Sequence, residues 1–243
     1  PAAPPPAAPP PAVAPTTPTP AATSELPPSS SPSPAQQESV AAPTPTIDHD
    51  RFVGHFGVGY MGLAQLPIAN ATGGAAVINA PVIGARYWLR RELGIDAGLG
   101  FALASGSIEG GGTSADKPSQ LGFAVHGGVP FNLAYGSHYT FQVVPELNLG
   151  LTSATLKGTP DVSLSGFRFD IGARAGAEIH FGFINVPELA LQASIGLYLH
   201  RESRSATPSG GQSSGESSTT FATSVQSDPW ALFANNISAL YYF

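Results

Sequence analysis

The sequence lacks cysteine altogether and carries little charge. The absence of cysteine excludes disulfides, cysteine metal sites and thiol catalysis, as well as a lipid anchor on an amino-terminal cysteine. Charged residues make up 11% of the 243 residues, and the only lysines are Lys117 and Lys157. A soluble domain normally carries about 25% charged residues, because its surface faces water. The shortage therefore argues against an ordinary soluble surface.

Long apolar runs and basic runs are also missing. No apolar stretch approaches about 18 residues, so the sequence predicts no transmembrane helix. The net charge is -6 and no basic run is present, which argues against nucleic acid as a partner. The chain starts at Pro1 without a signal peptide, and we interpret it as a processed or trimmed form from which a signal peptide has been removed.

Two parts of different composition follow each other along the chain. Residues 1–48 are mostly Pro, Ala, Ser and Thr, without apolar periodicity, so they predict a disordered tail with polyproline II character. The tail is interpreted as a passive spacer, and the alternative is a ligand for a proline-binding module. Residues 49–243 are rich in Gly, aliphatic and aromatic residues and form the second predicted domain.

This second part alternates in polarity with a period of two residues, which is typical of β-strands, and no stretch shows a helical period. In "LGIDAGLGFAL" (93–103), for example, one face is Leu, Ile, Ala and Phe, and the other is Gly, Asp and Ala. The period predicts eight strands, at residues 51–65, 77–89, 93–103, 120–133, 139–151, 167–181, 189–200 and 230–243.

The predicted connections alternate between long polar loops and short turns, which is the pattern of an outer-membrane β-barrel. In the four clearest strands the apolar face carries no charge. A charge that faces lipid at mid-depth costs about 2–4 kcal/mol, so this absence is expected in a bilayer. Aromatic residues stand at strand ends, as in an interfacial girdle: Phe52, Tyr87, Phe131, Tyr139, Phe181, Tyr241 and Phe243.

The carboxyl terminus carries a family resemblance. The last residues, "NISALYYF", end in Phe243, and Ile237, Ala239 and Tyr241 stand at alternating positions before it. This resembles the signal by which bacterial outer-membrane barrels are recognised and inserted by their assembly machinery. With eight strands and alternating loops, residues 51–243 resemble the small eight-stranded family typified by the outer-membrane protein A barrel.

The resemblance implies an all-β fold, an eight-stranded antiparallel up-and-down transmembrane β-barrel with a disordered tail. It implies a porin-like monomer of the bacterial outer membrane with both termini in the periplasm. Its partners would be outer-membrane lipid and the barrel assembly machinery, with no nucleic acid. A cell-wall or other periplasmic contact would run through the tail.

An eight-stranded barrel has room only for its own side chains, so charges that face the lumen must pair. The residues of this predicted lumenal charge network are Arg86, Asp96, His126, Glu146, Arg168, Asp170, Arg174, Glu178 and His200.

Hairpin arithmetic predicts the pairs in this network. We expect an Arg86–Asp96 pair near the short-turn end. Across the middle of the lumen we expect a row of three side chains, His126, Glu146 and Arg174, with Glu146 in the centre. The same arithmetic places Asp170 opposite His200 and Glu178 beside Gln142 and Gln192, and it leaves Arg168 without a mate.

The predicted role is structural or surface-interacting: a membrane anchor that presents four polar extracellular loops around a packed, charged lumen. The alternative is a small low-conductance ion channel with a salt-bridge gate in the lumen. Some small barrels are lipid A acyltransferases or deacylases, and "LHRES" (199–203) offers His200, Glu202 and Ser203. Strand neighbours point to opposite faces, so the sequence favours no enzyme. No third ligand joins His49 and His55, or Glu178 and His180, so we expect no metal and no cofactor.

Overall fold

The computed structural model describes residues 46–70, 73–110, 113–224 and 236–243, with the backbone alone for 107–118. The predicted tail lies almost wholly outside the described residues, and the part of the predicted last strand at 230–235 does so as well. No helix among the described residues is long and apolar enough to cross a membrane.

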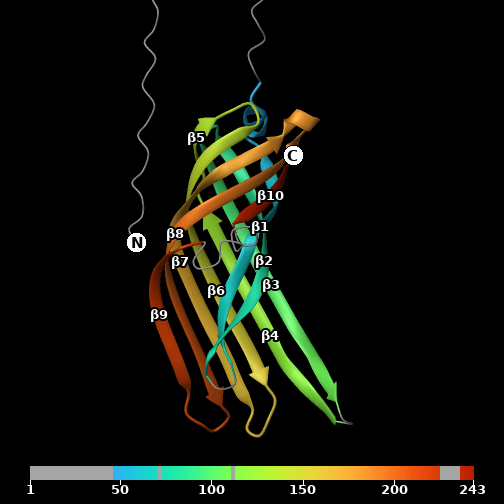
Figure 1. The fold of residues 1–243 in the computed structure, drawn as a ribbon, viewed down its shortest axis with the longest axis vertical. Helices are drawn as coiled ribbons and strands as arrows, with labels where there is room; N and C mark the ends of the chain where they lie inside the picture. Colours follow the sequence, from blue (N-terminus) through green and yellow to red (C-terminus); the bar gives the residue numbers. More distant parts are fainter. Residues whose placement is uncertain (1–45, 71–72, 111–112, 225–235) are drawn as a thin grey trace, which may run out of the picture. The chain divides into compact units, whose positions relative to one another are not determined.

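The described residues form one antiparallel sheet of ten strands and two short 3-10 turns, so the all-β prediction is confirmed and the number of eight strands is wrong (Figure 1). The strands are β1 Phe56–Ala69, β2 Ala75–Arg90, β3 Leu93–Gly110, β4 Thr113–Gly128, β5 Phe131–Tyr135, β6 Tyr139–Leu156, β7 Val162–Phe181, β8 Val186–Pro208, β9 Ser214–Thr223 and β10 Ile237–Tyr242. The 3-10 turns are η1 Asp48–Phe52 and η2 Gly182–Ile184.

One additional strand arises because a proline interrupts the predicted strand 120–133. β4 ends at Gly128, and β5 begins only after Pro130, which has no N–H to give to a ladder. The carbonyl of Pro130 still accepts a hydrogen bond from the Gly94 amide at 2.9 Å. β5 then pairs with Leu93, the first residue of β3, and with β6.

The other additional strand lies in a segment predicted as a long polar loop. β8 continues to Pro208, turns at Gly210 with a φ of +76°, and returns as β9 over a ten-residue ladder from Ala206↔Ser214 to Leu197↔Thr223. Serine and threonine can form such strands because the ladder uses only backbone groups and because threonine favours extended backbone. Two further predicted loops are largely ladder as well, since β3–β4 pairs out to Gly110↔Thr113 and β6–β7 out to Leu156↔Val162.

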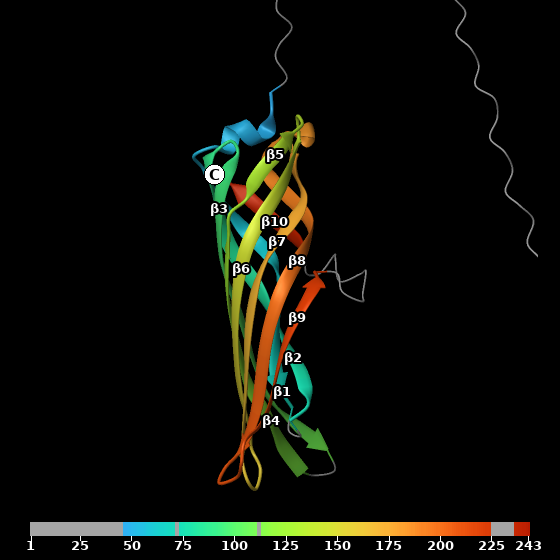
Figure 2. The same cartoon turned by 90° about the vertical axis from the view of Figure 1, so that its left-hand side faces the viewer.

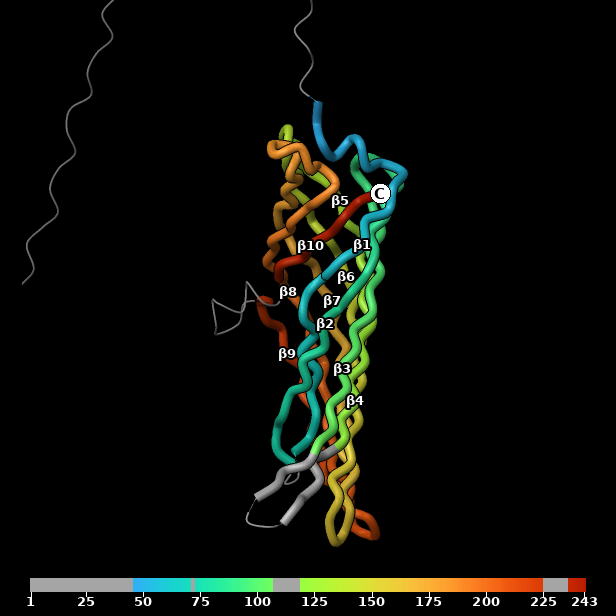
Figure 3. Tube along the Cα trace, turned by 90° about the vertical axis from the view of Figure 1, so that its right-hand side faces the viewer, coloured from blue at the N-terminus to red at the C-terminus, as the bar shows by residue number. Residues whose placement is uncertain are grey.

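The ladders form a closed cycle through part of the sheet. β10 pairs with β8 on one side and with β1 on the other, so Ala239 faces both Leu191 and Tyr60 (Figure 3). The pairings therefore run from β1 through β2, β3, β4, β6, β7, β8 and β10 back to β1. We call this part the ring. The chain ends at the ring's short-turn end, where the Phe243 amide donates to the Phe56 carbonyl at 2.9 Å.

β1 leaves the ring at a bulge. Its register shifts between Tyr60 and Gly62, and Gly62 adopts a φ of +132°, which favours glycine. Beyond the bulge, β1 pairs with β2 alone in the described structure. The hairpin of residues 62–69 and 75–82, which we call the inner hairpin, lies on the inner face of β6 and β7. Thr152 Oγ1 donates to the Pro67 carbonyl at 2.6 Å, and Arg168 Nη1 donates to the Gln65 carbonyl at 3.0 Å.

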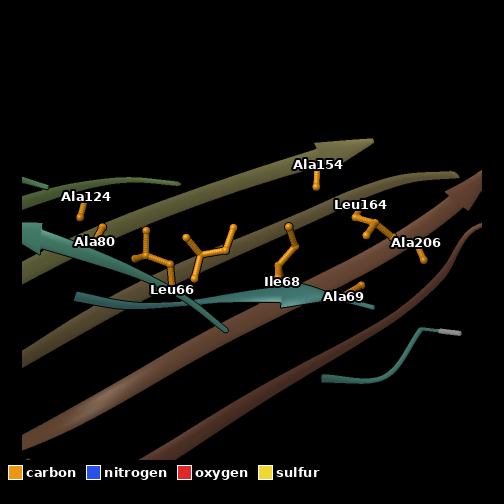
Figure 4. Packing of buried hydrophobic residues seen from close by; sticks show 9 residues of the cluster. Leu66, Ile68, Ala69, Ala80, Ala124, Ala154, Leu164 and Ala206 are labelled. Atoms are coloured by element: carbon orange, nitrogen blue, oxygen red, sulfur yellow. The ribbon is translucent and has the colours of Figure 1, made fainter. Parts of the chain in front are cut away.

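The inner hairpin makes an apolar core against the sheet (Figure 4). Its buried members are Leu66, Ile68, Ala69, Ile78, Ala80, Ala124, Ala154, Leu164 and Ala206. Small residues give the hairpin its space, because a Cβ at Gly122 would lie 3.2 Å from Leu66 Cδ1 and one at Gly166 would overlap the Pro67 carbonyl. Burial of a leucine or isoleucine side chain contributes about 1.5–3 kcal/mol.

Candidate functional site: buried charges and a cavity on the inner face

The two faces of the sheet have opposite polarity. On β8, for example, Leu191, Ile195 and Leu197 are exposed, and Gln192 and Ser194 between them are buried. The same alternation places large exposed apolar side chains on the outer face of β2, β3, β4, β6 and β7. On these strands the inner face thus carries buried polar residues, and the outer face carries exposed apolar ones.

The inner face near the short turns holds a chain of ion pairs. The Arg86 guanidinium lies between Asp96, 2.7 Å from Nε, and Glu178. The Arg174 guanidinium lies between Asp96 at 3.3 Å and Glu146 at 3.0 Å. We call these five residues the deep network, in which acids and arginines alternate and an acid stands at each end.

Both terminal acids of the deep network accept a further hydrogen bond from tyrosine. Tyr242 donates to Glu178 at 2.8 Å, and Tyr198 donates to Glu146 at 2.7 Å. Arg86 and Glu178 have no exposed side-chain surface at all. A buried charge is tolerated only when it is paired and hydrogen-bonded, and these contacts meet that requirement.

A second set of ion pairs, which we call the hairpin-side network, lies nearer to the long hairpins. Arg168 pairs with Asp170 at 2.8 Å and with Glu202 at 3.1 Å, and His200 Nδ1 lies 2.8 Å from Asp170 Oδ1. The prediction that Arg168 has no mate is therefore wrong. Glu202 was assigned to a loop, whereas the structure places it on β8, directly opposite Arg168 in the β7–β8 register.

Registers across tight turns agree with the hairpin arithmetic, and two others do not. Arg86 faces Asp96, Asp170 faces His200 and Glu178 faces Gln192. The predicted neighbours of Glu146 are wrong by two residues: Gly128 and Gly172 face it in place of His126 and Arg174. The break at Pro130 and the bulge after Asn132 shift the β4–β6 register. The loop 157–161 is not centred on Pro160 in the ladder, and this shifts β6–β7.

Long side chains restore part of the predicted contacts. Arg174 reaches Glu146 along the diagonal, and Gln142 donates to Glu178 at 3.1 Å although Thr140 faces Glu178 in register. The observed cross-strand row on β4, β6, β7 and β8 consists of His126, Asn148, Asp170 and His200.

A cavity of about 280 Å³ adjoins the deep network on the side of the long hairpins. One wall is apolar and comes from Met61, Leu66 and Val82. The charged and polar side chains that line the rest are His126, Glu146, Asn148, Arg168, Asp170, Arg174, Tyr198 and His200. The cavity therefore touches both networks.

The short-turn end is covered by η1 (Figure 2). Phe52 is buried there and stacks on Tyr242 at 4.8 Å and on His180 at 5.2 Å, so the prediction that Phe52 belongs to an exposed aromatic girdle is wrong. His49 packs edge-on against Trp88, and its Nε2 donates to the Arg91 carbonyl at 2.9 Å. Burial lowers the pKa of His49 below its ordinary value. No periodic pattern in the sequence marks this short segment.

The four predicted signal residues at the carboxyl terminus lie on the face opposite to the buried Leu240 and Tyr242. Tyr241 and Phe243 are exposed, with ring centroids 5.4 Å apart, and Ile237 and Ala239 are half-buried.

The candidate catalytic residues do not meet. His200 points to the inner face and contacts Asp170, whereas Ser203 has the opposite strand parity. No cluster of three metal-ligating side chains occurs in the described part of the chain.

Comparison with known proteins gives little. No family model matches the sequence, and no curated protein matches it. Among solved structures, a major outer membrane protein from Thermus thermophilus is 15% identical to this chain, with a TM-score of 0.38, and the alignment covers 78% of this chain and 98% of that one. A similarity this low carries no argument about function.

Proposed function

We propose that residues 49–243 form a transmembrane β-barrel of the bacterial outer membrane, with a structural or surface-interaction role. The observation that carries the proposal is the inverted polarity of the sheet, with charges buried inside and apolar side chains outside. On soluble monomers, contiguous exposed apolar patches rarely exceed a few hundred Å², because exposure of apolar surface to water is unfavourable. In a bilayer the apolar outer face contacts lipid and not water. The cyclic pairing of the ring satisfies the backbone N–H and C=O groups, with which lipid cannot form hydrogen bonds.

The ends of the ring suggest its orientation in the membrane. The carboxyl terminus, η1 and the short turns share one end, and an exposed Tyr241 and Phe243 there suit the membrane interface. We place this end, and the tail that precedes it, in the periplasm. The polar hairpins at the other end would then face outside the cell, presented by a monomeric anchor that contacts lipid and the assembly machinery.

Expression without a signal peptide tests the membrane assignment. We expect insoluble material that refolds only in detergent or lipid vesicles and shows heat-modifiable gel mobility. A soluble monomer would overturn the proposal.

A matched pair of variants tests which surface meets lipid. Leu197→Arg places a charge on the apolar outer face of β8, and Ser217→Arg places one at an exposed position of β9 that faces Ser203. We expect the first to lower the free energy of unfolding in vesicles by about 2–4 kcal/mol and the second to leave it nearly unchanged. Equal effects would contradict a lipid-facing outer surface.

A small ion channel is the second candidate. Arg86 and Arg174 each contact two acids, so each has an alternative partner, which a salt-bridge gate requires. The buried Trp88 and Tyr242 near the short-turn end oppose an open path. Planar-bilayer recordings of the protein, with Glu146→Ala and Arg174→Ala compared, test it: conductance that the two substitutions change supports the channel, and absent or unchanged conductance overturns it.

A further inference from the structure

Five residues that line the cavity on the inner face have a buried polar atom without a hydrogen-bond partner among the described residues. These atoms are Nε2 of His126 and of His200, Nδ2 of Asn236, and Oε2 of Glu146 and Nε of Arg174, the last two of which form an ion pair with each other. Both histidines are more than nine-tenths buried. A buried polar atom without a partner has lost its hydrogen bonds to water and regained none, so an occupant that contacts both histidine nitrogens would be stabilised.

The other nitrogen of each ring is already engaged. His200 Nδ1 lies 2.8 Å from Asp170 Oδ1 and 3.1 Å from Arg168 Nη2. We assign it as the donor in the shorter contact, because a carboxylate oxygen accepts; His126 Nδ1 donates to Asn148 Oδ1 at 2.7 Å. An uncharged imidazole that donates through Nδ1 leaves a lone pair on Nε2. The two imidazoles therefore present acceptors to the cavity, and an occupant that contacts both must supply hydrogen-bond donors.

The surrounding charges indicate the sign of the occupant. The deep network has three acids for two arginines, and the hairpin-side network has two acids, Asp170 and Glu202, for Arg168 alone. The next arginine on the inner face, Arg204, has its own partner in Glu216 at 2.6 Å. The two networks together carry two more negative than positive charges, so a cationic occupant is favoured over a neutral one.

The positions of the two acceptors indicate its shape. His126 and His200 stand at the two ends of the four-residue row, three strand spacings apart, which is about 14 Å between their Cα atoms along the sheet. A volume of about 280 Å³ exceeds the roughly 30 Å³ share of one water by enough for an elongated molecule of several heavy atoms.

We propose that this cavity binds a small organic cation with N–H donors at both ends, of the diamine class. Ammonium groups would donate to the two imidazole nitrogens and offset the surplus negative charge. The inference concerns the interior of the sheet and does not rest on the proposed membrane role.

Titration of the full chain with butane-1,4-diamine, compared with butane-1,4-diol, tests the proposal. The protein is folded in non-ionic detergent, or in buffer if it proves soluble, and binding is followed by calorimetry and by the ¹⁵N signals of the histidine rings. We expect the diamine to bind at least tenfold more tightly than the diol and to move the Nε2 signals of His126 and His200. Equal binding, or Nε2 signals that stay in place, would overturn it, since water would then fill the cavity.

Two pairs of variants separate this site from general charge effects. Glu202→Gln and Glu188→Gln each remove one negative charge, but Glu188 pairs with Arg51 near η1, away from the cavity. His126→Phe and His138→Phe each remove one imidazole, and His138 contacts Asp48 at the short-turn end. We expect the first member of each pair to weaken diamine binding about tenfold and the second to leave it within twofold. Heat-modifiable mobility, or melting if the chain is soluble, shows that each variant is folded; folded variants with equal affinities would contradict the proposed site.

Discussion

Two regions of the inner face of the sheet are filled with different kinds of side chain: the interior of the ring is charged, and the interior under the inner hairpin is apolar. Within the ring, the interior is occupied by Arg86, Glu178 and their partners, which are buried and paired. Under the inner hairpin, the interior is occupied by Leu66, Ile68 and small residues, with no ion pair in the apolar cluster itself. The cavity lies between the two regions.

The difference follows from what each region must fill. In the ring, side chains from facing strands meet across a narrow interior, and long arginines and glutamates reach one another there. Farther from the short turns, a segment of backbone occupies the interior, so the facing residues must be small, as Gly122, Gly150 and Gly166 are. A backbone segment brings its own hydrogen bonds, such as Thr152 to Pro67, and needs no charged partner.

Removal of Arg86 should give the largest effect and tests the charged region. In Arg86→Met, Asp96 and Glu178 remain buried without their shared cation, so we expect the free energy of unfolding in lipid vesicles to fall by about 3–5 kcal/mol. Arg204→Met is the matched control, because its partner Glu216 is largely exposed and the pair contributes about 1 kcal/mol or less. Urea titration measures both, and similar losses would show that burial of the network does not matter.

Addition of a single methyl group at Gly166 tests the inner hairpin, and we expect a smaller loss of stability than for Arg86→Met. A Cβ at Gly166 would overlap the Pro67 carbonyl, so Gly166→Ala must displace the hairpin, at a cost of about 1–3 kcal/mol. Amide hydrogen exchange over residues 62–69 should increase. Gly127→Ala is the control, because nothing lies within 4 Å of its added Cβ. Unchanged exchange in the Gly166 variant would place the hairpin elsewhere than against β7.

Acidification should give the smallest effect and separates η1 from both regions. The pKa of His49 is lowered by burial, so the unfolded chain binds a proton that the folded chain does not. The stabilisation by His49 is therefore complete above the ordinary histidine pKa of about 6.5 and is lost as the pH falls towards the lowered pKa.

His49→Phe isolates this contribution, since Asn132 and Tyr135 still donate to the Arg91 carbonyl. We expect the urea midpoint of the wild type to fall more than that of the variant between pH 7.5 and pH 5.0. The exposed His55, replaced by Gln, serves as the control. Parallel pH profiles for wild type and His49→Phe would contradict a buried, uncharged His49.

Particular residues show how far the sequence reaches. The two-residue period places Asp96, Gln142, Glu178 and Gln192 on one face, and each is buried in the structure. The Arg86–Asp96 register agrees with a turn centred on Arg91, and a register shift between Trp88 and Arg90 contributes to it. The β4–β6 and β6–β7 registers could not be predicted, since Pro130 and the loop 157–161 each move the pairing by two residues.

The sequence by itself determined the alternation of polarity, and with it which side chains share a face, because successive side chains of a strand must point to opposite sides. The tertiary structure alone decided that β10 joins β8 to β1, that η1 covers one end, and that β1 turns inward at Gly62. It also decided which acid each arginine contacts. Those outcomes depend on distances between residues far apart in the chain, which packing of the whole sheet sets and no local pattern encodes.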